Sequence, residues 1–171
     1  MYMKTVILER KSLFFDSQEH KSAHQIKEVG RVLISEMKES SNNDRSLLRP
    51  GVREVLEYLK SELFSIILCT DQRLEQTRNM LAEEFVDQYF EDIITARLFR
   101  SQVKKLLISS GTDHFIAGVF SDDARIELAT ELGLPCVSIR PDKDIPQGQE
   151  VLRVESVDEI DDAIAQAQIL Y

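Results

Sequence analysis

Short, nearly continuous apolar runs alternate along this chain with longer segments in which apolar residues recur at helical spacing. The first run, Val6-Ile7-Leu8, gives way to the polar residues Glu9 to Ser12, which indicates a buried strand leading into a turn. Further apolar runs predict strands over about 64–70, 92–96, 115–120 and 135–139, with an edge strand near 151–154. Helical spacing predicts helices over about 21–39, 102–109 and 124–132, and also after Pro50, after Thr70 and after Ser156.

Residue types at the expected helix ends agree with this pattern. Pro50 suits a first helical turn, Gly133 suits a helix stop, and Ser156 with Glu159 forms a capping box. In the helix after Thr70, we expect one apolar side, made of the residues Leu74, Leu81 and Phe85.

Strands that alternate with helices along the whole chain favour an α/β fold with a doubly wound parallel sheet. The 171 residues fit one domain, 1–171, because no linker is long enough to divide them. The segment at about 18–48 is expected to be a short helical insertion, which has room for one helix over 21–39.

Composition and charge narrow the classes of function. A net charge of −9 disfavours binding to nucleic acid or to an anionic membrane, and no apolar run is long enough to span a bilayer. Cys69 and Cys136 lie far apart in apolar runs, which indicates buried free thiols in a reducing compartment. The cytoplasm is therefore the expected location, and a protein partner is compatible with the acidic surface.

Polar side chains follow three of the apolar strands. They occupy the segments Glu9–Ser12, Thr70–Asp71 and Asp122–Asp123. In a doubly wound sheet, ligands bind beyond the carboxyl ends of the strands, where neighbouring loops diverge. We therefore expect these three loops to converge and to form the site.

Residues 6–17 resemble the first motif of the haloacid dehalogenase-like (HAD) phosphatases, V-I-F-D-x-D-G-T-L-F-D-S. Five positions match, and they are Val6, Ile7, Phe15, Asp16 and Ser17. The two positions that carry the chemistry of that family differ, since Glu9 replaces the nucleophilic Asp and Lys11 replaces the acid/base Asp. Leu13 also stands where Thr is usual. The resemblance covers roughly residues 5–140 and implies the HAD-like fold with a minimal one-helix cap.

The same resemblance assigns roles to other residues. Thr70 is similar to the second-motif hydroxyl that holds the transferring phosphoryl group, although an N-cap role is equally open. Asp122 and Asp123 resemble the fourth-motif carboxylates that hold Mg²⁺. The phosphate-binding cation of the third motif is expected at Arg100 or Lys104, with Lys105 as a weaker choice.

The substitutions in the first motif argue against the usual reaction. Glu9 would displace the attacking oxygen by about an ångström, which costs on the order of a hundredfold in rate. Lys11 is an ammonium and a poor proton donor next to carboxylates, which raise its pKa. We therefore expect a domain that has lost phosphatase activity, needs no cofactor, and binds a protein partner or a phosphorylated ligand at an open mouth. In this hypothesis Lys11 replaces the metal ion, its charge balanced by Glu9, Asp122 or Asp123.

Three alternatives remain open. A second register would make Asp16 the nucleophile, with Gln18 in place of the acid, and would favour a Mg²⁺-dependent phosphomonoesterase. A plain scaffold with an inactive cleft is the other reading. His20 and His24 stand four apart and could bind a metal on one helix face, although a solvated helix start is favoured because no third ligand is evident nearby.

Overall fold

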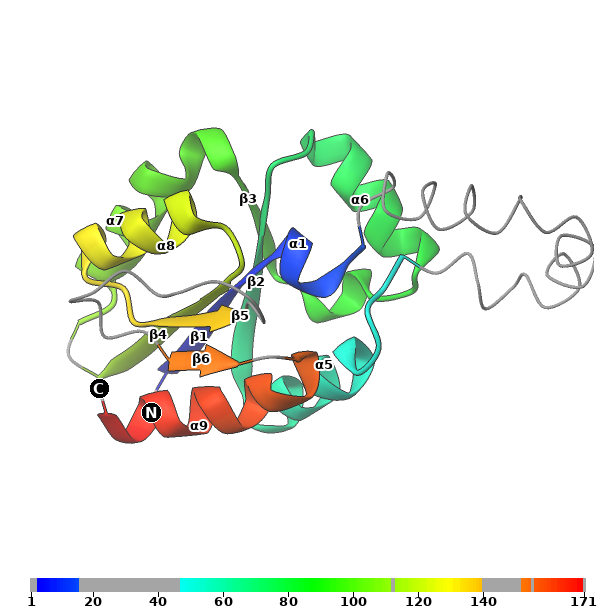
Figure 1. Cartoon of the computed structure of the whole chain (residues 1–171). Coiled ribbons are helices and arrows are strands. Elements are labelled where there is room, and N and C mark those ends of the chain that lie inside the picture. Colours follow the sequence, from blue (N-terminus) through cyan, green and yellow to red (C-terminus); the bar gives the residue numbers. More distant parts are fainter. Residues whose placement is uncertain (1–2, 16–46, 112, 140–151, 155, 171) are drawn as a thin grey trace, which may run out of the picture.

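The computed structural model describes residues 3–15, 47–111, 113–139, 152–154 and 156–170 (Figure 1). The predicted helix over 21–39, together with Asp16, Gln18, His20 and His24, lies outside the described residues. Within the described part of the chain, no helix is both long and apolar enough to cross a membrane.

Six parallel strands form a single sheet in the order β3-β2-β1-β4-β5-β6. Their bounds are β1 Met3–Glu9, β2 Phe64–Thr70, β3 Asp92–Thr95, β4 His114–Phe120, β5 Cys136–Ile139 and β6 Leu152–Val154. The central strand β1 lies between β2 and β4, so the loops after these three strands are neighbours. The predicted doubly wound parallel sheet is confirmed.

Helices cover both faces of the sheet. Below it in Figure 1 lie α5 (Val52–Ser61) and α9 (Ile160–Leu170), and above it lie α7 (Phe99–Ser109) and α8 (Asp123–Leu132). The other helical elements are α1 (Arg10–Leu13), α6 (Leu74–Glu83), η1 (Asp87–Tyr89), η2 (Ala96–Leu98) and η3 (Val157–Glu159). Successive strand residues enter opposite cores: Val6 and Leu8 pack with residues of α5 and α9, and Ile7 packs with residues of α7 and α8.

The expected elements were largely correct. The capping box expected at Ser156 is not formed, because the Ser156 side chain makes no cap hydrogen bond and a short 3-10 helix, η3, precedes α9. Three further details differ. Helix α7 begins at Phe99, three residues before the predicted start. In α6 only Leu81 of the expected apolar side is buried, since Leu74 is 36% exposed and Phe85 is 75% exposed. The reason is that α6 ends at Glu83, so Phe85 no longer follows the helical period. Its φ of 56° is left-handed.

The third difference is at the start of α5, where Pro50 lies before the helix and not in its first turn. Gly51 caps the helix with a left-handed φ of 86°, and a Cβ there would collide with the side chain of Asp158. The left-handed φ therefore favours glycine at this position, while the exposed Asp158 carboxylate would have to move to admit a Cβ.

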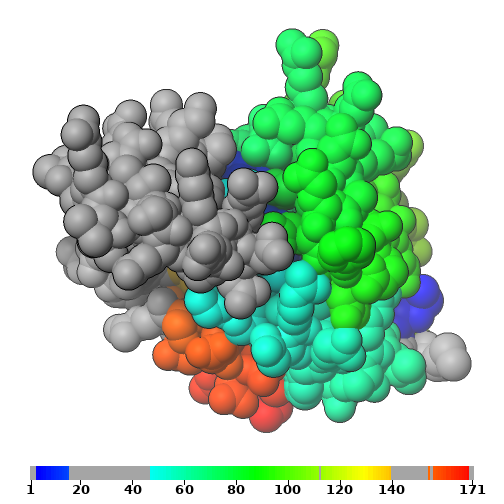
Figure 2. Space-filling view, turned by 90° about the vertical axis from the view of Figure 1, so that its right-hand side faces the viewer, coloured from blue at the N-terminus to red at the C-terminus, as the bar shows by residue number. Residues whose placement is uncertain are grey.

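The chain leaves and rejoins the domain at adjacent points on either side of residues 16–46. Phe14 and Leu48 form an antiparallel bridge, and the backbone N–H of Phe15 donates to the carbonyl of Leu47 at 2.6 Å. The returning chain is fixed to the end of α6, because the N–H of Leu47 donates to Glu84 Oε1 at 3.0 Å. Figure 2 shows this face of the molecule, with the cyan residues that lead into α5 beside the green residues of α6.

Candidate functional site

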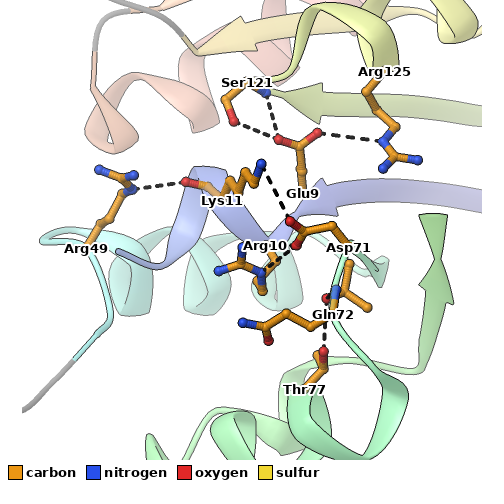
Figure 3. Close-up of polar contacts among 10 residues, drawn as sticks. Glu9, Arg10, Lys11, Arg49, Asp71, Gln72, Thr77, Ser121 and Arg125 are labelled. Atoms are coloured by element: carbon orange, nitrogen blue, oxygen red, sulfur yellow. Dashed lines mark hydrogen bonds and ion pairs between the residues drawn. The ribbon is translucent and has the colours of Figure 1, made fainter. Parts of the chain in front are cut away.

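The predicted convergence of three loops is confirmed, because β1, β2 and β4 are adjacent and end at the same edge. Glu9 is the last residue of β1 and is opposite Cys69 of β2, while Leu8 is opposite Val119 of β4. Figure 3 shows the polar side chains that gather there from all three loops. They form two separate ion pairs, one around Glu9 and one around Asp71.

Glu9 is buried, with 4% of its surface exposed, and both of its carboxylate oxygens face polar groups. Its Oε1 accepts hydrogen bonds from the hydroxyl of Ser121 at 2.7 Å and from the backbone N–H of Ser121 at 3.3 Å. Its Oε2 lies 3.8 Å from Nε of Arg125. Burial raises the pKa of Glu9 above its usual value, and the Ser121 hydrogen bonds and the charge of Arg125 only partly offset this effect.

Arg125 is held in place by aromatic packing. Its guanidinium lies over the ring of Phe99, 4.8 Å from the centroid, and its side chain is 11% exposed. Phe99 packs edge-on against Phe120, with their centroids 5.6 Å apart. Gly118 leaves the space that the Phe120 ring occupies, since a Cβ at that position would collide with the ring.

The second ion pair lies on the exposed side of the site. Asp71 Oδ1 accepts from Nε of Arg10 at 2.9 Å and lies 2.9 Å from Nη2 of the same guanidinium. Asp71 Oδ2 lies 3.5 Å from Nζ of Lys11, whose side chain is 44% exposed, whereas that of Arg10 is 3% exposed. Desolvation acts to raise the pKa of Asp71, but the hydrogen bond and charge of Arg10, with the charge of Lys11, outweigh it and lower the pKa.

These contacts correct the expectation for Lys11. We expected Glu9, Asp122 or Asp123 to balance its ammonium, but its ion partner in the described part of the chain is Asp71. The cation that faces Glu9 is Arg125. Lys11 is also fixed through its backbone, because its carbonyl accepts from Nε of Arg49 at 3.1 Å.

Thr70 directs its hydroxyl into the protein. The residue is 1% exposed, its Oγ1 lies 2.9 Å from Oγ1 of Thr77, and it accepts from the N–H of Gln72 at 3.1 Å. The expected N-cap role is wrong, because the residue at the N-cap of α6 is Arg73. The hydroxyl therefore closes the β2–α6 turn from the inside.

The paired aspartates after β4 lie at the start of α8, where the charge of Asp122 adds to the effect of burial in raising the pKa of Glu9. Asp122 caps α8, its Oδ1 accepting from the N–H of Ala124 at 3.1 Å, and Asp123 is an exposed first residue of that helix. The residue of this loop that contacts Glu9 is Ser121, one position earlier. The position of this loop that faces the end of β1 is therefore held by a serine, and the carboxylates expected to bind the metal follow it by one and two residues.

The expected phosphate-binding cations are not brought to these loops. Arg100 pairs with Glu131 at 3.1 Å on the surface. Glu131 lies near the end of α8, about 12 Å along the helix from Asp123 at 1.5 Å per residue. Lys104 and Lys105 are exposed on α7. Thr70 and Arg100 therefore do not form one site.

Sequence reasoning missed Ser121, Arg125 and Arg10 as site residues. Arg125 lies one helical turn after Ser121, and side chains in a helix tilt toward its N-terminus, which would have placed this cation back over the strand ends. Arg10 carries no such signal, because its burial depends on α1, a helix of only four residues.

No family model matches the sequence, and none of the curated protein sequences matches it either. Solved structures do match over nearly the whole chain. A HAD-superfamily hydrolase of subfamily IA from Geobacter sulfurreducens superposes with a TM-score of 0.62 at 18% identity, covering 94% of this chain and 98% of that one. A HAD phosphatase from Thermococcus onnurineus gives 0.65 at 14%, covering 95% and 98%. A haloacid dehalogenase-like hydrolase from Xanthomonas campestris gives 0.64 at 10%, covering 98% and 99%.

Proposed function

We propose that this chain, which has the HAD-like fold, no longer hydrolyses phosphate esters and acts by binding, as a pseudophosphatase. The state of Glu9, the residue in the position of the nucleophile, carries this proposal. A nucleophilic carboxylate must reach the phosphorus atom of a substrate, but Glu9 is 4% exposed and its oxygens face Ser121 and Arg125. An attack on substrate would require both contacts to break.

The acid/base position supports the same conclusion. In the resembled family a carboxylic acid at this position protonates the leaving oxygen. Here the position holds the ammonium of Lys11, whose Nζ lies 3.5 Å from Oδ2 of Asp71. Among the described residues, the first-motif positions Glu9 and Lys11 thus supply neither a carboxylic acid for the leaving oxygen nor an available nucleophile.

The contacts on the exposed side of the site favour a protein partner over a phosphorylated ligand. The hydroxyl of Thr70 is turned inward and Arg100 is paired with Glu131, so the two groups expected to hold a phosphate are engaged elsewhere. Lys11 and Asp71 instead present one positive and one negative side chain, each about four-tenths exposed. Side chains of a partner protein can match such a pair with their own opposite charges.

Hydrolysis of p-nitrophenyl phosphate with millimolar Mg²⁺ tests the loss of activity. We expect wild type, Glu9→Gln and Asp16→Asn to release p-nitrophenol at the same background rate. Turnover by the wild type that either substitution abolishes would refute the proposal and identify the nucleophile.

The structure also bears on which residue occupies the position of the nucleophile. β1 ends at Glu9, which supports the register with Glu9 at the strand end, while Asp16 lies outside the described residues.

Inorganic phosphate separates the two kinds of ligand. We expect millimolar phosphate to leave the thermal unfolding midpoint of the wild type unchanged relative to chloride at equal ionic strength. A rise in the midpoint that is lost in Thr70→Val but kept in Ser65→Ala, a control on the same strand, would show that the site binds a phosphorylated ligand. A rise that both variants keep would indicate binding at another place.

A further inference from the structure

We infer that the guanidinium of Arg125 occupies the place beside Glu9 where HAD hydrolases would require a divalent cation, so that the site carries a resident cation in place of a metal. This inference rests on the proposed function. It differs from the sequence-based hypothesis, which assigned that role to Lys11. Its basis is that three observations on Glu9, its surroundings and Arg125 agree.

The first observation is that both oxygens of Glu9 already face donor or cationic groups. Oε1 accepts two hydrogen bonds from Ser121, and Oε2 faces Arg125 at 3.8 Å. The Ser121 hydroxyl is a neutral group that points its proton at the carboxylate. Mg²⁺ requires near-octahedral coordination by oxygens and usually includes one or two carboxylates. A cation at Oε2 would lie against the guanidinium, and like charges repel at that distance.

The second observation is that the neighbouring carboxylates are committed to other groups. Asp122 caps α8, and Asp71 is held by Arg10 and Lys11. No group of three or more His, Cys, Asp or Glu side chains able to hold a metal occurs among the residues that the structure describes. The residues present here therefore do not fit a divalent cation.

The third observation is that Arg125 is fixed where it compensates Glu9. Its side chain is 11% exposed and stacks on Phe99, which in turn packs on Phe120. Glu9 Oε2 and Arg125 Nε are both buried without a hydrogen bond, so the pair is joined by charge across 3.8 Å. Burying a carboxylate is costly unless a cation balances it, and arginine keeps its charge at every pH at which proteins fold.

Lys11 does not meet these conditions. Its side chain is 44% exposed, and its ammonium lies 3.5 Å from Oδ2 of Asp71 (Figure 3). Removing the charge of Lys11 should therefore leave the surroundings of Glu9 unchanged, whereas removing that of Arg125 should leave a buried carboxylate without its cation. This difference gives a matched pair of variants.

Binding of Mn²⁺, followed by the electron paramagnetic resonance of the free ion, tests the inference at neutral pH. We expect Arg125→Gln to bind one Mn²⁺ at least about tenfold more tightly than the wild type, because the repulsion of the guanidinium is gone. Arg125→Lys and Lys11→Gln should match the wild type. The double variant Glu9→Gln/Arg125→Gln should lose the gain, which would place the metal at Glu9.

Several results would overturn the inference. Tighter Mn²⁺ binding in Lys11→Gln but not in Arg125→Gln would show that Lys11 is the resident cation. Unchanged Mn²⁺ binding in both variants would show that neither side chain stands in for a metal ion. If Arg125→Gln does not fold, the wild type decides the question through its amide NMR spectrum. Mn²⁺ should leave the signals of Ser121 and Arg125 sharp, and selective broadening of both would show that a metal enters beside the guanidinium.

These outcomes are independent of the phosphatase assay. A wild type that is inactive but binds Mn²⁺ at Glu9 would refute the inference and leave the proposed loss of activity standing. A wild type that hydrolyses the ester without any divalent ion would refute the loss of activity and leave the resident cation standing.

Discussion

Ser121 donates both its hydroxyl and its backbone N–H to the same oxygen of Glu9, across the ends of β4 and β1. Two strands that are neighbours in the sheet thus end in one hydrogen-bonded unit, and the charge of Arg125 faces its other side. A carboxylate that is desolvated needs such partners in order to remain charged. The site is built to hold a buried negative charge in place.

Substitution of Ser121 by alanine should destabilise the protein, because Glu9 would lose its shortest hydrogen bond. A hydrogen bond to a charged group contributes about 1.5–3 kcal/mol, and the remaining bond from the amide N–H should leave the loss near the lower end. Urea unfolding at neutral pH measures the change in free energy. The pKa of Glu9, followed by carboxyl NMR, should rise further in this variant.

Asp122→Ala is the matched control for Ser121→Ala. It removes the cap of α8, which costs about 1 kcal/mol, without touching a hydrogen bond of Glu9. The charge of Asp122 is the smallest of the effects that raise the pKa of Glu9, so this variant should lower that pKa slightly, whereas Ser121→Ala should raise it. Equal pKa changes in the two variants would contradict the role assigned to the Ser121 hydroxyl.

The sequence was sufficient to predict the sheet and the meeting of its loops, because apolar runs and helical spacing report burial directly. The strand predicted over 64–70 is β2, and Thr70 and Glu9 end neighbouring strands as expected. Apolar runs and helical spacing do not predict which side chains pair with each other within the site. Whether Lys11 reaches Glu9 or Asp71 depends on the turn of α1, a four-residue helix that no periodicity can define.

A one-residue difference had the largest effect on the site. The pattern of a strand followed by two aspartates drew attention to Asp122 and Asp123, although Ser121 is the residue that faces Glu9. Side chains change direction at every residue of an extended segment, so an uncertainty of one position reverses which side chain points inward. Arg100 shows the same limit, since its ion pair with Glu131 depends on how α7 and α8 cross.

The raised pKa of Glu9 predicts a pH dependence of stability that Glu9→Gln should lack. Because the folded pKa exceeds the unfolded value of 4.5, the folded state binds the proton more tightly. The stability from this group is fully present below pH 4.5 and is lost as the pH rises through the folded pKa. The free energy of unfolding of the wild type should therefore fall relative to that of Glu9→Gln over this window. A constant difference between the two proteins would contradict the raised pKa.

The left-handed conformation of Phe85 predicts that glycine is better tolerated there than alanine. Phe85 has a φ of 56° and is 75% exposed, so its ring contributes little burial, while a left-handed non-glycine residue costs roughly 1–2 kcal/mol. Glycine relieves this cost and alanine retains it, although glycine also loses about 0.5–1 kcal/mol of chain entropy. Phe85→Gly should therefore be more stable than Phe85→Ala by up to about 1.5 kcal/mol in urea unfolding. The reverse order would show that the positive φ is not strained.

The lowered pKa of Asp71 predicts the opposite pH dependence on the exposed side of the site. The stability from this group is present above the unfolded pKa of 3.8 and is lost as the pH falls through the lower folded pKa. Asp71→Asn should thus be less stable than the wild type at neutral pH, by about 1–3 kcal/mol, because Arg10 loses its charged acceptor. Lys11→Gln should cost less than about 1 kcal/mol, since an ion pair this exposed is screened by water. Urea unfolding from roughly pH 2.5 to pH 7, a range that brackets the titration of an aspartate, should show the stabilities of Asp71→Asn and the wild type converging at the acid end. If the two remain equally far apart at low pH, the stabilisation by Asp71 does not depend on its charge.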